Sequence, residues 1–129
     1  MKYLWDTNTA IYYLQQQLPP SAEKFIDALL NNTGRPVISA ITEIELLCWK
    51  TTTRKDQEVL YNFIGDSLVI ELEQPIKLKT ADIRKACRIK LLDAIIAATA
   101  IMYNLSLISR NTTDFKNIPA LTIINPYTL

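Results

Sequence analysis

The 129-residue sequence contains no histidine. This absence excludes Ser-His-Asp and Cys-His catalysis and an imidazole general base, and it removes the ligand on which most zinc sites depend. Cysteine is almost as scarce, because Cys48 and Cys87 are the only two and form no CxxC motif. Both lie in helix-like contexts, so we expect two small buried hydrophobic side chains in a reducing compartment.

Glycine, long apolar runs and an excess of either charge are scarce as well. Fourteen basic and thirteen acidic residues give a net charge of +1, so any basic patch must be local. Two glycines and 49% hydrophobic residues are typical of a helix-rich globular domain, and we expect one domain over residues 1–129. The apolar stretch 94–103 is too short to span a bilayer, and Asp6 interrupts the N-terminal apolar run. We therefore expect a cytoplasmic protein with no membrane association.

Short apolar runs alternate with helical patterns along the chain. The predicted strands are residues 2–5, 36–39, 68–71, 105–109 and 121–125. The predicted helices are residues 7–17, 21–31, 41–50, 55–64, 76–88 and 93–103. This alternation predicts a three-layer α/β/α domain with a central, mainly parallel sheet of about five strands. Ligands of such sheets bind beyond the carboxyl ends of the strands.

Two aspartates follow predicted strands. Asp6, in YLWDTN, could cap the next helix or belong to a charged site. Asp114 lies in the polar loop of ISRNTTDF after the fourth strand, so we expect it at the same sheet edge as Asp6. A solvated loop aspartate is the alternative for Asp114.

A third aspartate, Asp93, begins a predicted helix whose following residues are apolar on every side. That pattern indicates a buried helix, and the helix macrodipole favours an anion at its N-terminus. Capping explains the residue type, but a carboxylate at the mouth of a buried helix still needs counter-charge.

One helix offers two glutamates, and helical geometry distinguishes them. A single stripe of helix 41–50, expected to face the protein, contains Ile41, Ile44, Leu47 and Cys48. Glu45 lies beside Ile41 on the flank of that stripe, so we expect it to face the protein. Glu43 is expected to project to the opposite side, into solvent.

Carboxylates from four separated segments could thus converge. In a chain without imidazole, clustered Asp and Glu side chains suit hard cations such as Mg²⁺ or Mn²⁺, which prefer oxygen ligands. Two such ions could activate water and stabilise both oxygens of an in-line phosphoryl displacement, which would supply the missing general base.

These segments together resemble a PIN domain, most closely a VapC-type toxin ribonuclease of a toxin–antitoxin pair, across nearly the whole chain. The segments are LWDTN with Asp6, ISAITEIELL with Glu45, KLLDAIIAATA with Asp93 and ISRNTTDF with Asp114, followed by IPALTIINP. The resemblance implies that the four acids bind Mg²⁺ or Mn²⁺ and cleave RNA with metal-activated water, leaving a 5′-phosphate and a 3′-hydroxyl.

The resemblance implies further roles. Asn8 and Asn111 would be polar neighbours of the acids, and Thr42 would orient a carboxylate. It also implies a homodimer and a cognate VapB-like antitoxin. This chain departs from the family in one place, because Leu92 precedes Asp93 where proline is common.

Basic residues gather just before Asp93. The candidate RNA contacts are Lys77, Arg84 and Arg88 on one stripe of helix 76–88, then Lys90, with Arg110 close to Asp114. A solvated helix face is the alternative for such a run.

Two other classes of protein stay open. One is a catalytically inactive PIN-fold binding module that acts through RNA or protein partners. The other is a receiver-like domain phosphorylated on Asp6, but receivers use adjacent acids after a strand and a lysine after a late strand, and this sequence has neither.

Overall fold

The computed structural model describes residues 2–129. Its strands are β1 (Tyr3–Trp5), β2 (Val37–Ser39), β3 (Leu68–Ile70), β4 (Ser106–Ile108) and β5 (Ile123–Ile124). Each corresponds to a predicted strand, and β1 with β4, β4 with β5, and β2 with β3 all pair in parallel. The predicted parallel arrangement is therefore confirmed.

The strands do not form one continuous ladder. Hydrogen bonds join β1, β4 and β5 into one sheet and β2 with β3 into another. β1 and β2 lie alongside each other, but within residues 2–129 no ladder joins them. We call this junction the β1/β2 seam. Strands of two or three residues make few ladder bonds, so a slight separation is enough to interrupt the pairing.

Helices fill the segments between the strands. They are α1 (Thr7–Leu14), α2 (Pro20–Thr33), α3 (Ala40–Leu47), α4 (Arg54–Asp66), α5 (Gln74–Ala86), α6 (Leu91–Met102), α7 (Thr112–Phe115) and the 3₁₀ helix η1 (Pro126–Thr128). The six predicted helices are present. The sequence pattern missed α7 and η1 because each is a single turn, begun by the side-chain caps of Asn111 and Asn125, and is too short to show periodicity.

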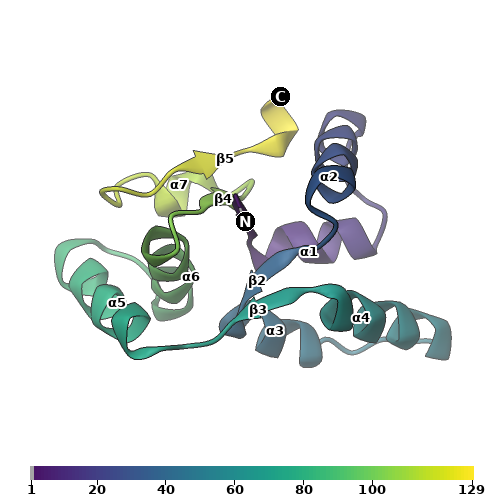
Figure 1. Ribbon diagram of the computed structural model, residues 1–129, viewed down its shortest axis with the longest axis horizontal. Coiled ribbons are helices and arrows are strands. Elements are labelled where there is room, and N and C mark those ends of the chain that lie inside the picture. The colour runs from purple at the N-terminus through teal and green to yellow at the C-terminus, as the bar shows by residue number, and fades with distance from the viewer. Residues whose placement is uncertain (1) are drawn as a thin grey trace.

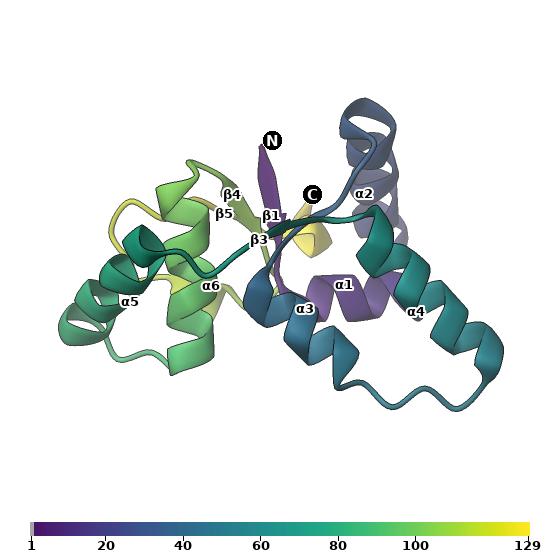
Figure 2. The ribbon, with the colours of Figure 1, turned by 60° about the horizontal axis from the view of Figure 1, so that its bottom comes forward.

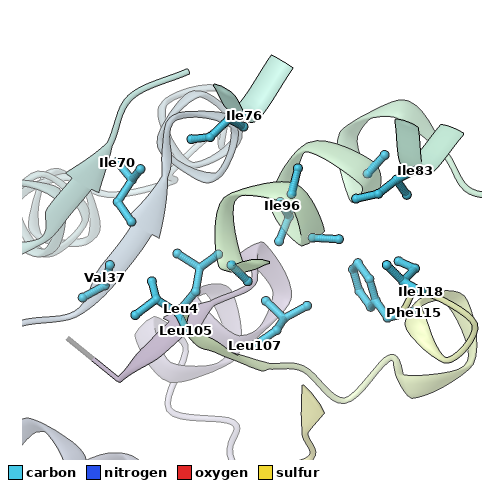
Figure 3. Packing of buried hydrophobic residues seen from close by; sticks show 14 residues of the cluster. Leu4, Val37, Ile70, Ile76, Ile83, Ile96, Leu105, Leu107, Phe115 and Ile118 are labelled. Carbon is cyan, nitrogen blue, oxygen red and sulfur yellow. The ribbon is translucent and has the colours of Figure 1, made fainter. Parts of the chain in front are cut away.

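Two hydrophobic clusters lie on opposite faces of the strands. Leu4 and Leu107 belong to the cluster that packs against α5 and α6, which Figure 3 shows. Their neighbours Trp5 and Ile108 belong to the other cluster, with residues of α1, α2 and α4. Successive strand residues point to opposite faces, so this division confirms the three-layer arrangement visible in Figures 1 and 2.

Two predictions about burial are wrong. Most of the α3 stripe does not face the protein: Ile41 packs against the core, but Ile44 is 53% and Leu47 52% exposed, and the buried residues of α3 are Thr42 and Leu46. Cys48 is exposed and Cys87 only half-buried. Both cysteines are residues at which a helix ends rather than interior helix positions, so neither is carried into the core.

The helices were also compared with the length of a bilayer. None that the structure describes between residues 2 and 129 is long and apolar enough to cross a membrane.

Candidate active site

Asp6 stands at the carboxyl end of β1 and is only 5% exposed. It caps α1, because its Oδ1 accepts a hydrogen bond from the backbone N–H of Thr9 at 2.8 Å. The ladder pairs Trp5 with Ile108, so the next residues, Asp6 and Ser109, lie side by side, and the Ser109 hydroxyl bonds the Asp6 carboxylate. Burial nevertheless raises the pKa of Asp6 above its usual value. Asp6 is therefore the cap of α1, and its place in a charged site stays a prediction.

A chain of hydroxyl groups leads to Glu45. Thr7 Oγ1 donates to Glu45 Oε1 at 2.6 Å and lies 3.0 Å from Thr42 Oγ1, which in turn accepts from Ser39 Oγ at 3.3 Å. A hydroxyl carries a single proton, and that of Thr7 goes to Glu45, so Thr42 must donate to Thr7. All three hydroxyl side chains are buried. Thr42 thus acts on Glu45 through Thr7 rather than directly.

Glu45 faces the interior for a different reason from the predicted one. Thr42 lies three residues earlier on the same helix face, and Ser39 caps α3 by accepting from the Thr42 N–H at 3.1 Å. This polar face, not the apolar stripe, turns toward α1. Glu43 is half-buried in the first turn of α3 rather than fully solvated.

Asp93 is half-buried in the first turn of α6, whose residues 94–100 are all buried. Helix α6 begins two residues before the predicted start, at Leu91. Burial raises the pKa of Asp93, and the negative charges of Asp114, Glu45 and Asp6 add to that rise, while Lys90 opposes it. The other three carboxylates, each from a separate segment, therefore lie within electrostatic reach of Asp93.

Asp114 is exposed and is held by Asn111 at the start of α7. Asn111 Nδ2 donates to Asp114 Oδ2 at 2.7 Å, and its Oδ1 lies 3.4 Å from the Asp114 N–H, which donates to it. Asn8, the other predicted polar neighbour, is exposed, and its side chain makes no hydrogen bond to any of residues 2–129.

The donor set fits a hard divalent cation in its chemistry. All four groups are carboxylates, and among the residues that the structure describes no lysine or arginine forms a salt bridge with any of them. Burial and nearby like charges therefore raise the pKa of Asp6 and Asp93, and neither carboxylate forms a salt bridge with a described residue. As the side chains lie, no three Asp, Glu or Cys residues in the described range are arranged to hold an ion. Mutual repulsion of unneutralised carboxylates favours such a spread.

Basic side chains line a cleft beside two of these acids. The cleft, of about 450 Å³, is lined by Arg84, Arg88, Ile89, Lys90, Asp93 and Asp114. Lys77 instead lines a separate, mostly apolar cavity with Leu72 and Ile95. Arg110 is not part of the cleft lining; it follows Ser109 in the chain and lies over the ring of Tyr127. Three of the five predicted RNA contacts therefore border the cleft.

Three hydroxyl residues of the site were missed at the sequence level. Ser109 could have been found from the parallel register, since it is the residue beside Asp6 once β1 and β4 are paired. Thr7 and Ser39 carry no local signal, because their roles depend on the packing of α1 against α3.

Parallel strands covered by helices on both faces, with Asp6 directly after β1, describe the fold of this protein. The sequence matches the PIN domain family over residues 3–121, and the chain belongs to that family. A search of curated proteins found no match.

Solved structures narrow the resemblance to toxin–antitoxin complexes. This protein matches a chain in the structure of the DNA-bound VapBC of Salmonella typhimurium with a TM-score of 0.82 and 27% identity, over 98% of both chains. It matches one from a Klebsiella pneumoniae toxin–antitoxin complex with a TM-score of 0.79 and 30% identity, over 98% of both chains. A third match, from Rickettsia felis VapBC2 bound to a DNA fragment from their promoter, has a TM-score of 0.77 and 25% identity, over 97% of this chain and 98% of that one.

Proposed function

We propose that this PIN-domain protein is a metal-dependent endoribonuclease and the toxin of a type II toxin–antitoxin pair. The observation that carries the proposal is the electrostatic coupling of Asp93 to Asp6, Glu45 and Asp114. The proposal places four carboxylates, each from a separate segment, around one site, and no described lysine or arginine forms a salt bridge with any of them. A site that concentrates unneutralised negative charge is suited to divalent cations.

The residues divide the work as follows. Asp6, Glu45, Asp93 and Asp114 would hold Mg²⁺ or Mn²⁺, which supplies water activation and charge neutralisation for phosphodiester hydrolysis. Ser109, Thr7 and Asn111 hold three of these carboxylates by hydrogen bonds. Arg84, Arg88 and Lys90 would receive the RNA backbone in the adjoining cleft.

The products would carry a 5′-phosphate and a 3′-hydroxyl, and the RNA would be cytoplasmic. We further propose a homodimer and a VapB-like antitoxin as partners. Two observations support them: the likeness to chains from toxin–antitoxin complexes, and exposed apolar side chains on α3, α5 and α6, namely Ile44, Leu47, Leu78, Leu91 and Leu92.

The purified protein is expected to cleave single-stranded RNA of mixed sequence in Mn²⁺ or Mg²⁺ and to be inactive in EDTA. The assay uses RNA labelled at its 5′ end, and products are tested for a free 3′-hydroxyl by extension with poly(A) polymerase. Extension separates metal-dependent hydrolysis from host ribonucleases that leave cyclic phosphates.

Asp93→Asn protein, purified in parallel, is the control for contaminating nuclease. Cleavage that persists in EDTA, or that is equal in the Asp93→Asn preparation, would contradict the proposal. RNA binding without metal-dependent cleavage would instead support the inactive binding module.

The two glutamates of α3 give a matched comparison. Glu45→Gln keeps an oxygen that accepts from Thr7 but removes the charge, so we expect cleavage to fall by at least about tenfold. Glu43→Gln makes the same chemical change in the same helix and is expected to stay close to the wild-type rate. Steady-state cleavage of one RNA by both variants measures this, and the reverse order would show that Glu43 is the functional glutamate.

A further inference from the structure

A cation stacked on an aromatic ring lies beside the acid site. Cζ of Arg110 is 4.8 Å from the centroid of the Tyr127 ring. Tyr127 belongs to η1, which follows β5 and packs against α2 (Figure 1). Its ring meets the ring of Tyr12, in α1, edge-on with centroids 6.5 Å apart. Side chains from three distant segments thus build one stacked arrangement.

This arrangement is fixed relative to the carboxylates. Arg110 stands between Ser109, which bonds Asp6, and Asn111, which bonds Asp114. Because both flanking residues are tied to an acid, the backbone of Arg110 is held at the edge of the site. Burial raises the pKa of Tyr127, the nearby Arg110 guanidinium opposes that rise, and the charge of Asp6 adds to it, which agrees with a ring close to both Arg110 and the site.

Arg110 does not serve to neutralise the acids. It is exposed, and it forms no salt bridge with any carboxylate in residues 2–129 although Asp6 and Asp114 are bonded by its neighbours. The guanidinium instead lies over a ring. An exposed arginine that lies against an aromatic ring can also stack on the π-face of a further group.

We propose that Arg110, supported by Tyr127, is a stacking platform for an unpaired nucleobase next to the phosphodiester cleaved at the acid site. The proposal rests on the proposed ribonuclease function and deepens it. Guanidinium planes and aromatic rings stack on the π-faces of bases, and these faces are open only where a base is unpaired. The substrate class would be single-stranded or loop RNA, read in part by one stacked base.

The test uses a single-stranded RNA that the wild-type protein cleaves at a mapped position. Each nucleotide near that position is replaced in turn by an abasic residue, and kcat/KM is measured. One abasic replacement is expected to lower kcat/KM of the wild-type protein roughly tenfold, as loss of one stacked base does. Arg110→Lys keeps the charge but removes the planar guanidinium. Its kcat/KM on intact RNA is expected to be lower than that of the wild-type protein by a similar factor, and the abasic replacement is expected to cause no further fall.

Two further variants check the assignment. Tyr127→Leu removes the supporting ring and is expected to lower kcat/KM on intact RNA, with no further loss on the abasic RNA. Arg54→Lys makes the same change at an exposed arginine of α4 that pairs with Glu58, and is expected to have no effect on either RNA.

The opposing results are distinct. If Arg110→Lys cleaves as wild type and remains sensitive to the same abasic position, the platform is wrong and Arg110 contacts phosphate or a protein partner. If the abasic and Arg110→Lys losses simply multiply, the base stacks elsewhere. If the wild-type protein cleaves no RNA at all, the proposed function fails, and the platform fails with it.

Discussion

Asp6→Asn protein is expected to fold and yet to lose RNA cleavage by at least about hundredfold. Asparagine keeps an oxygen that can accept from the Thr9 N–H, so the cap of α1 survives while the charge is removed. Changing groups that merely orient metal ligands costs about ten- to hundredfold, and loss of a ligand itself should cost more. Cleavage in Mn²⁺ and far-UV circular dichroism of the same preparation measure the two halves of this expectation.

Asp66→Asn, at the exposed C-terminal end of α4, is the matched control and should cleave as wild type. Unchanged cleavage by Asp6→Asn would show that Asp6 is a helix cap alone. If the fraction of folded protein falls as much as cleavage does, Asp6 acts on stability rather than on catalysis.

Asp93→Asn is expected to raise the melting temperature of the metal-free protein by a few degrees at neutral pH. The pKa of Asp93 is raised in the folded protein, so the folded state binds more protons than the unfolded state between the ordinary pKa of 3.8 and the raised value. The free energy of unfolding therefore falls as the pH rises through that interval. Below the ordinary pKa the group is protonated in both states, and the advantage of asparagine should vanish.

Added Mn²⁺ should reverse the order of the two proteins. An ion that binds only the folded state stabilises it by about 2.7 kcal/mol at a hundredfold excess over Kd, and Asp93→Asn should lose much of that gain. Thermal melts at neutral and acidic pH, each with EDTA or with Mn²⁺, give four melting temperatures for each of the two proteins. A metal-free Asp93→Asn protein that melts well below wild type would indicate a structural partner for Asp93 and would contradict the converging carboxylates.

The positions of the three aspartates were predictable because each lies next to a local signal. Asp6 and Asp114 come after apolar runs that had to be parallel strands, and Asp93 precedes a stretch apolar on all sides. Parallel strands place their carboxyl ends at one edge, so nearness in space followed from topology without knowledge of any contact.

The orientation of α3 was not predictable in the same way. Periodicity distinguishes two faces of a helix, but it assigns the apolar face to the interior by default. In α3 the inward face carries Thr42, Glu45 and Leu46. The Thr42 hydroxyl finds its side-chain hydrogen-bond partners in α1 and β2. Such a pairing of distant polar groups leaves no trace in a local pattern.

The β1/β2 seam divides the acid site mechanically. The side of the molecule built around β1 and β4 carries Asp6, Asp93 and Asp114. Glu45 belongs to α3, which follows β2 and lies with the β2–β3 pair. No ladder bonds cross the seam in the part of the chain described, so side-chain packing and the Thr7 contacts with Thr42 and Glu45 hold it. Repulsion between Glu45 and the three aspartates would push the two sides of this junction apart, and a bound cation would draw them together. A cation bound by all four acids would therefore also join the two sheets.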